Sequence, residues 1–228
     1  MPIRRPSPRA PQSILVVGLG RFGSALAETL VAMGREVLGV DENADLVQRW
    51  APFLTHVVQA DTTDEEALRQ LGAAEFDRAI VAIGTDIEAS VLTVLALHEI
   101  GVKEIWAKAI SVKHGKILTG IGAAHVIYPE GEMGRRVAHM LASSLQDYIE
   151  WDGYALARVG APQVTWGVPL GKSQLRAKHR ITVVGVREPG GLYTYADMDT
   201  VIHRGDELLI TGAVASIDAF SRLPTGDE

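Results

Sequence analysis

A glycine-rich loop between a strand-like run and a helix-like run constrains this chain more than any other feature. Gly18, Gly20 and Gly23 stand in GxGxxG order, after the apolar run 13–17 and before the run 24–33. In such a loop the first glycine permits a tight turn, the second lets backbone N–H groups approach a phosphate, and the third lets the helix pack closely on the sheet. Unpaired N–H groups and the helix dipole both attract an anion. The loop therefore predicts a phosphate-binding site at a helix N-terminus.

An acidic residue completes the pattern that an adenine nucleotide requires. The run 36–41 reads as a second strand and ends in Asp41, which follows the first glycine by the roughly 20 positions expected of a ribose-binding acid. A carboxylate at this place accepts hydrogen bonds from a ribose diol and repels a 2′-phosphate. We expect a bound adenine nucleotide rather than a glycine turn without a ligand.

Strand-like and helix-like runs then alternate along the first half of the chain, which predicts an α/β fold: a Rossmann-like doubly wound parallel sheet of about six strands. Further strands are expected at 55–58, 78–83, 104–107 and 125–127, and helices at 44–51, 64–71, 87–100 and 112–121. Ligands of such sheets bind outside the carboxyl ends of the strands. Asp41, Asp61 with Thr62, and Gly84 with Thr85 should therefore converge on one rim.

The pattern changes after this Rossmann-like domain, expected at 13–132. Met133, Val137, Met140, Leu141, Leu145 and Tyr148 recur at steps of three or four, which predicts an amphipathic bridging helix over 133–152. Period-2 runs at 154–159, 181–186 and 207–210, separated by glycines, predict a second, smaller α+β C-terminal lobe over 153–228. The Pro- and Arg-rich residues 1–12 are expected to form a disordered tail.

Composition narrows the classes of function. A net charge of −6 and a pI near 5.7, without a basic cluster after the tail, argue against a nucleic-acid partner. The absence of cysteine excludes disulfides and thiolate chemistry, which favours the cytoplasm. No run approaches the ~20 apolar residues of a membrane span, so action at a membrane would need a partner.

A small NAD(P)-dependent oxidoreductase is the principal alternative. It would need an acid/base pair, but His179 and His203 of the second lobe have no evident orienting partner. Within the rim, Arg21 and Lys108 are candidate cations that would favour a nucleoside triphosphate beside NAD. A cytosolic piece of a channel is a third alternative, which the opening Met1 disfavours.

Six segments together resemble the cytosolic regulatory subunits of bacterial Ktr/Trk potassium uptake systems, which are built from RCK domains. They are Gly18-Leu19-Gly20-Arg21-Phe22-Gly23, Leu38-Gly39-Val40-Asp41, Val81-Ala82-Ile83-Gly84, Trp106-Ala107-Lys108-Ala109, Ile121-Gly122-Ala123 and Pro129-Glu130-Gly131-Glu132-Met133-Gly134. The resemblance runs from about residue 13 to 221 and implies a regulator rather than an enzyme.

The resemblance also implies the ligands of the rim: ATP and ADP in competition, with NAD or NADH as further ligands. Phosphate contacts would come from the 18–23 loop, including Leu19 and Phe22, with Arg21 and Lys108. The ribose would lie at Asp41 and the adenine near Asp61 and Thr62, and the binding set also includes Glu42, Ile83 and Gly84. Glu130 would help to hold Mg²⁺ or Ca²⁺ near the terminal phosphates of ATP. Neighbouring Glu132 could serve instead, or both acids could merely favour a helix dipole.

The same resemblance implies an assembly and a second ligand. Subunits would pair through the bridging helix into an octameric ring of dimers, peripheral on the inner face of the membrane beneath a channel or transporter subunit of the KtrB/TrkH type. Cyclic di-AMP, bound by some members, would contact Leu175, Arg176, Ile181 and Thr182 in the second lobe. Arg180 stands where the family often has glycine, and residues 193–198 lack the proline often found there, so this second ligand stays open.

Overall fold

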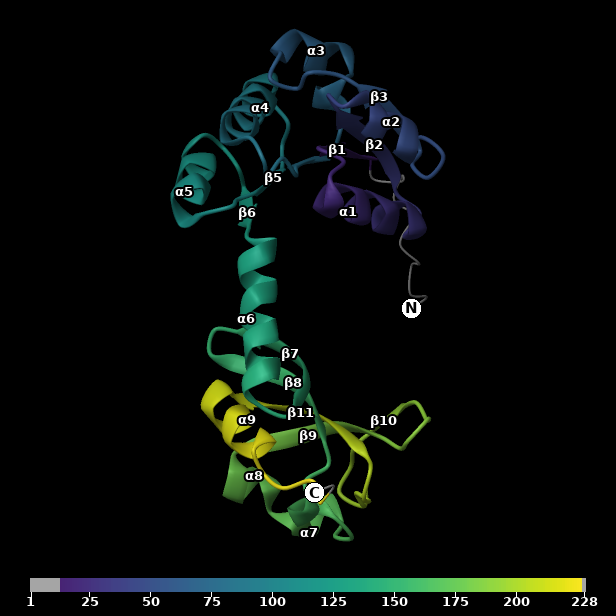
Figure 1. Cartoon of the computed structure of the whole chain (residues 1–228), viewed down its shortest axis with the longest axis vertical. Coiled ribbons are helices and arrows are strands. Elements are labelled where there is room, and N and C mark those ends of the chain that lie inside the picture. Colours follow the sequence, from purple (N-terminus) through teal and green to yellow (C-terminus); the bar gives the residue numbers. More distant parts are fainter. Residues whose placement is uncertain (1–12, 227–228) are drawn as a thin grey trace, which may run out of the picture. The chain divides into compact units, whose positions relative to one another are not determined.

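The computed structural model describes residues 13–226, which form two compact units, one ending at Glu130 and the other beginning at Gly131 (Figure 1). The expected tail at 1–12 lies outside the described residues. In the described part of the chain, no helix is long and apolar enough to cross a bilayer.

The N-terminal unit is a six-stranded parallel sheet flanked by helices. The strands lie in the order β3-β2-β1-β4-β5-β6. The elements are β1 (Ser13–Val17), α1 (Arg21–Ala32), β2 (Glu36–Asp41), α2 (Ala44–Trp50), β3 (His56–Gln59), α3 (Glu65–Gln70), η1 (Ala73–Glu75), β4 (Arg78–Val81), α4 (Ile87–Ile100), β5 (Ile105–Lys108), α5 (Val112–Gly120) and β6 (His125–Ile127). The predicted doubly wound sheet is confirmed.

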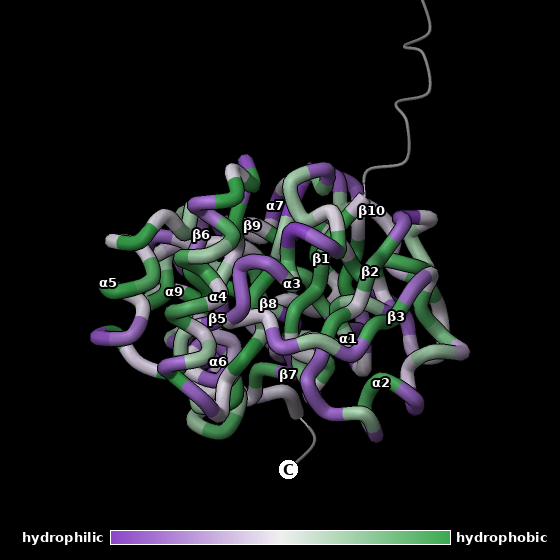
Figure 2. Tube along the Cα trace, turned by 90° about the horizontal axis from the view of Figure 1, so that it is seen from above, coloured by the Kyte–Doolittle hydropathy of each residue, from purple (hydrophilic) through white to green (hydrophobic). Residues whose placement is uncertain are grey.

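Both faces of this sheet are covered, because the central strands are apolar throughout. Along β1, Leu15 and Val17 belong to one buried cluster, and Ile14 and Val16 belong to another. A strand that is buried on both faces reads as a continuous apolar run rather than as an alternation. Figure 2 shows β1 and β2 as largely hydrophobic segments of the chain.

Strand β1 is the point at which the order of the sheet reverses. It pairs in parallel with β2 on one side and with β4 on the other. Ligands of open α/β sheets bind at such a reversal, outside the carboxyl ends of the strands. The 18–23 loop leaves β1 at this end, so the fold places the predicted phosphate site where this topology favours a ligand.

The C-terminal unit has a five-stranded antiparallel sheet in the order β10-β9-β11-β8-β7. Its strands are β7 (Leu145–Trp151), β8 (Tyr154–Gly160), β9 (Ile181–Arg187), β10 (Tyr193–Tyr195) and β11 (Glu207–Ala213). Its shorter elements are η2 (Gln163–Thr165), α7 (Leu170–Ser173), α8 (Leu175–His179) and α9 (Val214–Ser221). The predicted smaller α+β lobe is confirmed, with β7 and β10 as strands that the sequence pattern did not identify.

The bridging helix predicted over 133–152 is wrong in its extent. Helix α6 spans Pro129–Ala142, and Leu145 and Tyr148 lie in β7. A register shift between Leu145 and Asp147 adds one residue to β7. Leu145 and Tyr148, three positions apart, therefore both face the core and are 4% and 3% exposed. The bulge reproduced the three-residue step of a helix, which explains the error.

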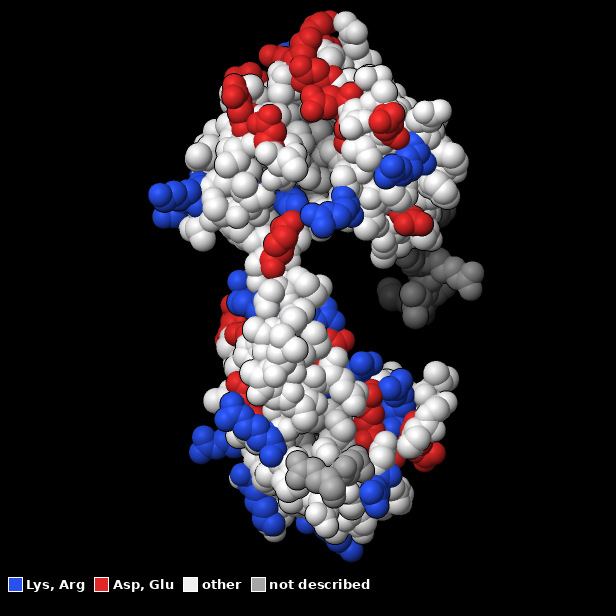
Figure 3. Space-filling view, in the orientation of Figure 1, with Lys and Arg blue, Asp and Glu red and all other residues white. Residues whose placement is uncertain are grey.

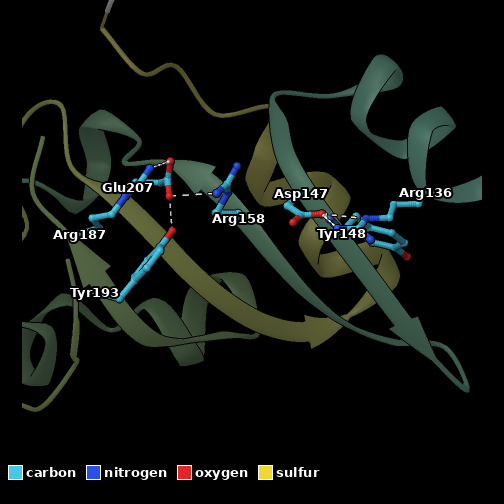
Figure 4. Close-up of polar contacts among 7 residues, drawn as sticks. All are labelled: Arg136, Asp147, Tyr148, Arg158, Arg187, Tyr193 and Glu207. Atoms are coloured by element: carbon cyan, nitrogen blue, oxygen red, sulfur yellow. Dashed lines mark hydrogen bonds and ion pairs between the residues drawn. The ribbon is translucent and has the colours of Figure 1, made fainter. Parts of the chain in front are cut away.

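Polar contacts join the middle of α6 to β7 and link strands of the second sheet (Figure 4). Arg136 of α6 donates to Asp147 of β7, with Nε 2.8 Å from Oδ1. On the sheet, Glu207 accepts from Arg187 Nη2 at 2.8 Å and from the Tyr193 hydroxyl, while Arg158 Nε lies 3.6 Å away. Burial, reinforced by Glu207, raises the pKa of Tyr193 to about 12, so this phenol stays a hydrogen-bond donor at neutral pH.

Candidate functional site

Two of the three loop glycines are required by neighbouring protein atoms. Gly18 has φ +90°, a backbone conformation that residues other than glycine rarely adopt, and its N–H donates to the Val40 carbonyl at 2.8 Å. A Cβ at Gly23 would lie 1.8 Å from the Gly18 carbonyl oxygen. Helix α1 begins at Arg21, so Gly23 lies in its first turn and brings that turn against the loop.

Gly20 differs, because the space around it is open. A Cβ at Gly20 would have no described atom within 4 Å. Gly20 caps α1, yet no side chain of residues 13–226 accepts a hydrogen bond as its N-cap, and the first turn carries no acid. The N–H groups at the start of this 12-residue helix therefore have no side-chain cap among the described residues. This is the geometry that a phosphate group needs.

Two backbone N–H groups hold the Asp41 carboxylate, one from the glycine-rich loop and one from the residues before α2. Its Oδ2 accepts from the Leu19 N–H at 2.7 Å, and its Oδ1 accepts from the Asn43 N–H at 2.9 Å. Each carboxylate oxygen can accept more than one hydrogen bond, so lone pairs remain for a ribose diol. Glu42 is exposed, and its carbonyl accepts from Gln59 Nε2 at 3.0 Å.

Asp61 and Thr62 follow β3 but point to different surroundings. The Asp61 carboxylate accepts from the hydroxyl and the N–H of Thr63, and these hydrogen bonds lower its pKa. Thr62 is buried and its hydroxyl lies 2.9 Å from that of Thr93 on α4. Of this predicted pair, Asp61 is exposed, whereas Thr62 is buried and contacts α4.

Lys108 is the cation that the fold brings to the glycine-rich loop. It ends β5, is 8% exposed, and its Nζ lies 5.8 Å from the centre of the Phe22 ring. A Cβ at Gly84 would lie 2.9 Å from Nζ, so the glycine after β4 leaves room for the ammonium group. Ile83 contributes a side chain beside Gly18. The structure thus brings Phe22, Gly84 and Lys108 together, from three separate segments.

Glu130 completes this end of the rim. Its Oε1 lies 2.7 Å from Lys108 Nζ, and its side chain is 66% exposed. The hydrogen bond from Lys108, together with the charges of Lys108 and Arg21, lowers the pKa of Glu130. At the start of α6, Figure 3 shows basic side chains meeting an acidic one, whereas acidic side chains cover the region of α3. The sequence does not predict the pairing of Lys108 with Glu130, because the two residues lie 22 positions apart and share no motif.

Within residues 13–226 there is no group of three or more His, Asp or Glu side chains that could hold a metal ion by itself. The predicted ligand Glu130 therefore offers a single carboxylate. Such a donor fits a divalent cation only where phosphate oxygens or a second copy of the chain supply further ligands.

The predicted second-lobe residues line one cavity of about 480 Å³. Leu175 and Ile181 are buried, and Arg176 Nε donates to the Thr182 hydroxyl at 3.2 Å. Arg180 ends α8 with φ +55°, in the left-handed region. A backbone that requires positive φ favours glycine, so Arg180 is accommodated at some cost in strain.

Comparison with known proteins identifies the family. The model of the TrkA-N domain matches residues 14–129, and that of the TrkA-C domain matches residues 157–224. Ktr system potassium uptake protein C of Bacillus subtilis (strain 168) is 38% identical, over 91% of this chain and 95% of that protein. The chain belongs to the Ktr/Trk family of potassium uptake proteins. Ktr system potassium uptake protein A of the same organism is 36% identical, over 90% and 93% of the two chains.

Solved structures agree on the fold of this Ktr/Trk family member. The GsuK RCK domain superposes with a TM-score of 0.65 at 21% identity, covering 94% of this chain and 48% of that one. The TrkA-N domain of the inner membrane protein ybaL from Escherichia coli covers 57% and 96%, with a TM-score of 0.52 at 23% identity. The expected RCK architecture is confirmed.

Proposed function

We propose that this chain is a cytosolic regulatory subunit of a potassium transport system and that it binds an adenine nucleotide on the rim of its N-terminal unit. The observation that carries the nucleotide site is the uncapped N-terminus of α1 at Gly20, flanked by the Lys108 ammonium group and the Asp41 carboxylate. The role in potassium transport rests on family membership, since its curated relatives are named as potassium uptake proteins.

ATP and ADP are the proposed competing ligands, with NAD or NADH as further ones. A cationic Lys108 and an exposed Arg21 next to the loop favour a ligand with several phosphates. The GsuK channel bound to NAD superposes with a TM-score of 0.64 at 21% identity, covering 92% of this chain and 39% of that one. That likeness supports a dinucleotide as a second ligand class for the same rim.

The regulatory step requires more than one copy of the chain. Met133, Val137 and Leu141 on α6 are 51%, 38% and 83% exposed, which supports pairing through this helix. We propose that pairs assemble into an octameric ring beneath a membrane-embedded potassium channel or transporter. A nucleotide can move that assembly only through different affinities for two ring shapes, and a shift from mostly closed to mostly open takes ~5 kcal/mol. Eight sites could share that free energy.

A divalent cation is the proposed partner of ATP. Glu130 would hold Mg²⁺ or Ca²⁺ together with terminal phosphate oxygens, and the cation would supply charge neutralisation for the phosphates. Because the described residues offer no complete ligand set, the cation should require the nucleotide.

The cavity at α8 and β9 is the place proposed for cyclic di-AMP. Its buried Leu175 and Ile181 offer apolar walls, and Arg176 offers a cation among the lining residues. A pocket of this kind suits a ligand with flat bases and phosphate groups.

Substitution of Asp41 tests the nucleotide site. Asp41→Ala should weaken ATP, ADP and NAD alike, by about 1–3 kcal/mol, because all three share the ribose whose hydrogen bonds are lost. Calorimetric titration provides the measurement, and Asp45→Ala, an exposed acid on α2, is the matched control. Unchanged ADP binding in the Asp41 variant would show that the rim is wrongly assigned.

The oxidoreductase alternative has its own test. A dehydrogenase would change the absorbance of NADH during turnover, so a spectrophotometric screen for hydride transfer distinguishes the two functions.

A further inference from the structure

The Glu130 carboxylate forms an ion pair with the buried cation of the phosphate rim. Lys108 is 8% exposed, and a buried ammonium group needs an anionic partner. In this structure Glu130 is that partner, with Oε1 2.7 Å from Nζ. A terminal phosphate bound at the loop would need the same ammonium group.

The position of Lys108 makes this conflict direct. Its Nζ lies 5.8 Å from the centre of the ring of Phe22, a residue in the first turn of α1. The same Nζ would lie 2.9 Å from a Cβ at Gly84. Arg21, the other candidate phosphate ligand, is close enough for its charge to lower the pKa of Glu130. Glu130 is thus within electrostatic reach of both cations assigned to the phosphates.

We propose that Glu130 is an internal anion that competes with the terminal phosphate for Lys108, and that phosphate binding releases Glu130 to accept the divalent cation. This inference rests on the proposed nucleotide site. It assigns Glu130 two successive roles that act in opposite directions on nucleotide affinity.

The proposal imposes an order on binding. A cation that approaches first meets a carboxylate already engaged by Lys108, so Mg²⁺ or Ca²⁺ alone should bind weakly. A nucleotide that approaches first withdraws Lys108, and the freed carboxylate and the phosphate oxygens then offer oxygen ligands together. The number of phosphates should matter, because AMP lacks the β- and γ-phosphates that could reach Lys108.

A different result is expected if Glu130 only binds the cation and does not compete with the phosphate for Lys108. Removing such a ligand would weaken ATP binding with Mg²⁺ and would leave binding in a chelator unchanged. Under competition, removing the carboxylate should strengthen binding in the chelator. The sign of the change in chelator therefore separates the two.

The experiment compares the full-length wild-type chain with Glu130→Gln and with the matched control Glu99→Gln, an exposed acid near the end of α4. Dissociation constants of ATP, ADP and AMP are measured by calorimetry in EDTA and in Mg²⁺. In EDTA, Glu130→Gln should bind ATP about two- to fivefold more tightly than wild type, the range for an ion pair with an exposed partner. AMP binding should be unchanged, and Glu99→Gln should resemble wild type throughout.

In Mg²⁺ the order should reverse, with wild type gaining affinity for ATP and Glu130→Gln gaining little. The effect of Glu130→Gln in EDTA should also disappear when Lys108 is replaced by Met, because the two residues act as a pair. Equal or weaker ATP binding by Glu130→Gln in EDTA overturns the proposal while leaving the nucleotide site intact. Failure of the wild-type chain to bind any nucleotide would instead refute the proposed function.

Discussion

Replacing Gly23 by Ala tests the loop geometry most directly, with Gly20→Ala as its control. A Cβ at position 23 would lie 1.8 Å from the Gly18 carbonyl oxygen and 3.0 Å from the Ala82 Cβ. The loop would have to move by roughly 1.2 Å before the first contact reached 3.0 Å, the limit below which Cβ atoms are essentially never found. At position 20 the same methyl group would meet no described atom within 4 Å.

The expected magnitude follows from opposing terms. Overpacking costs typically ~1–3 kcal/mol, and alanine recovers up to ~1 kcal/mol of helix propensity relative to glycine. We expect Gly23→Ala to lose about 1–2 kcal/mol of the free energy of unfolding, which corresponds to a fall in Tm of roughly 3–10 °C for a domain of this size. Gly20→Ala should lose under ~1 kcal/mol, because only the cap is changed.

The assay combines thermal unfolding by circular dichroism with calorimetric titration of ADP. Both variants should bind ADP more weakly, Gly23→Ala because the loop is displaced and Gly20→Ala because its methyl group occupies the space facing the helix N-terminus. Only Gly23→Ala should be clearly less stable. Equal stability of the two variants, or unimpaired ADP binding by Gly20→Ala, would refute this reasoning.

Two further substitutions test where α6 ends. Leu145→Ala should lower the free energy of unfolding by ~2–5 kcal/mol, because it leaves a cavity in a packed core. Leu141→Ala, at a residue that is 83% exposed, should change it by less than ~0.5 kcal/mol. If α6 pairs two copies, Leu141→Ala should instead lower the sedimentation coefficient at micromolar concentration, and a wild-type chain that sediments as a monomer with and without ATP would contradict the assembly. Acid titration tests the rim, because the pKa of Glu130 is lowered in the folded chain from its ordinary value of 4.5: the stabilisation is present above that value and is lost as the pH falls through the lower folded value. Chemical denaturation at pH 6 and at pH 3.5 should therefore show that the wild-type chain loses more stability between these two values than the Glu130→Gln variant loses. Identical losses would argue against the ion pair.

Local sequence patterns predicted the structure correctly where the relevant residues lie within one segment of the chain. The glycine loop, the acid at the end of β2 and the doubly wound parallel sheet followed from spacing, because each depends on residues that are close in sequence or on the general rule that βαβ connections are right-handed. The same local evidence misled at β7. A bulge placed Leu145 and Tyr148 on one face of a strand at the spacing of a helix, and only pairing with β8 distinguishes the two.

The sequence by itself determined the α/β class, the glycine-rich loop and the family, since these depend on the kinds of residue and their order. Only the tertiary structure decided what those residues contact. It turned Thr62 toward Thr93, left Gly20 open while closing Gly23 against Gly18, and joined Lys108 to Glu130. Such contacts depend on where strands end in the folded sheet, and the physical reason is that a buried charge or hydroxyl group takes whichever partner the packing brings within hydrogen-bond distance.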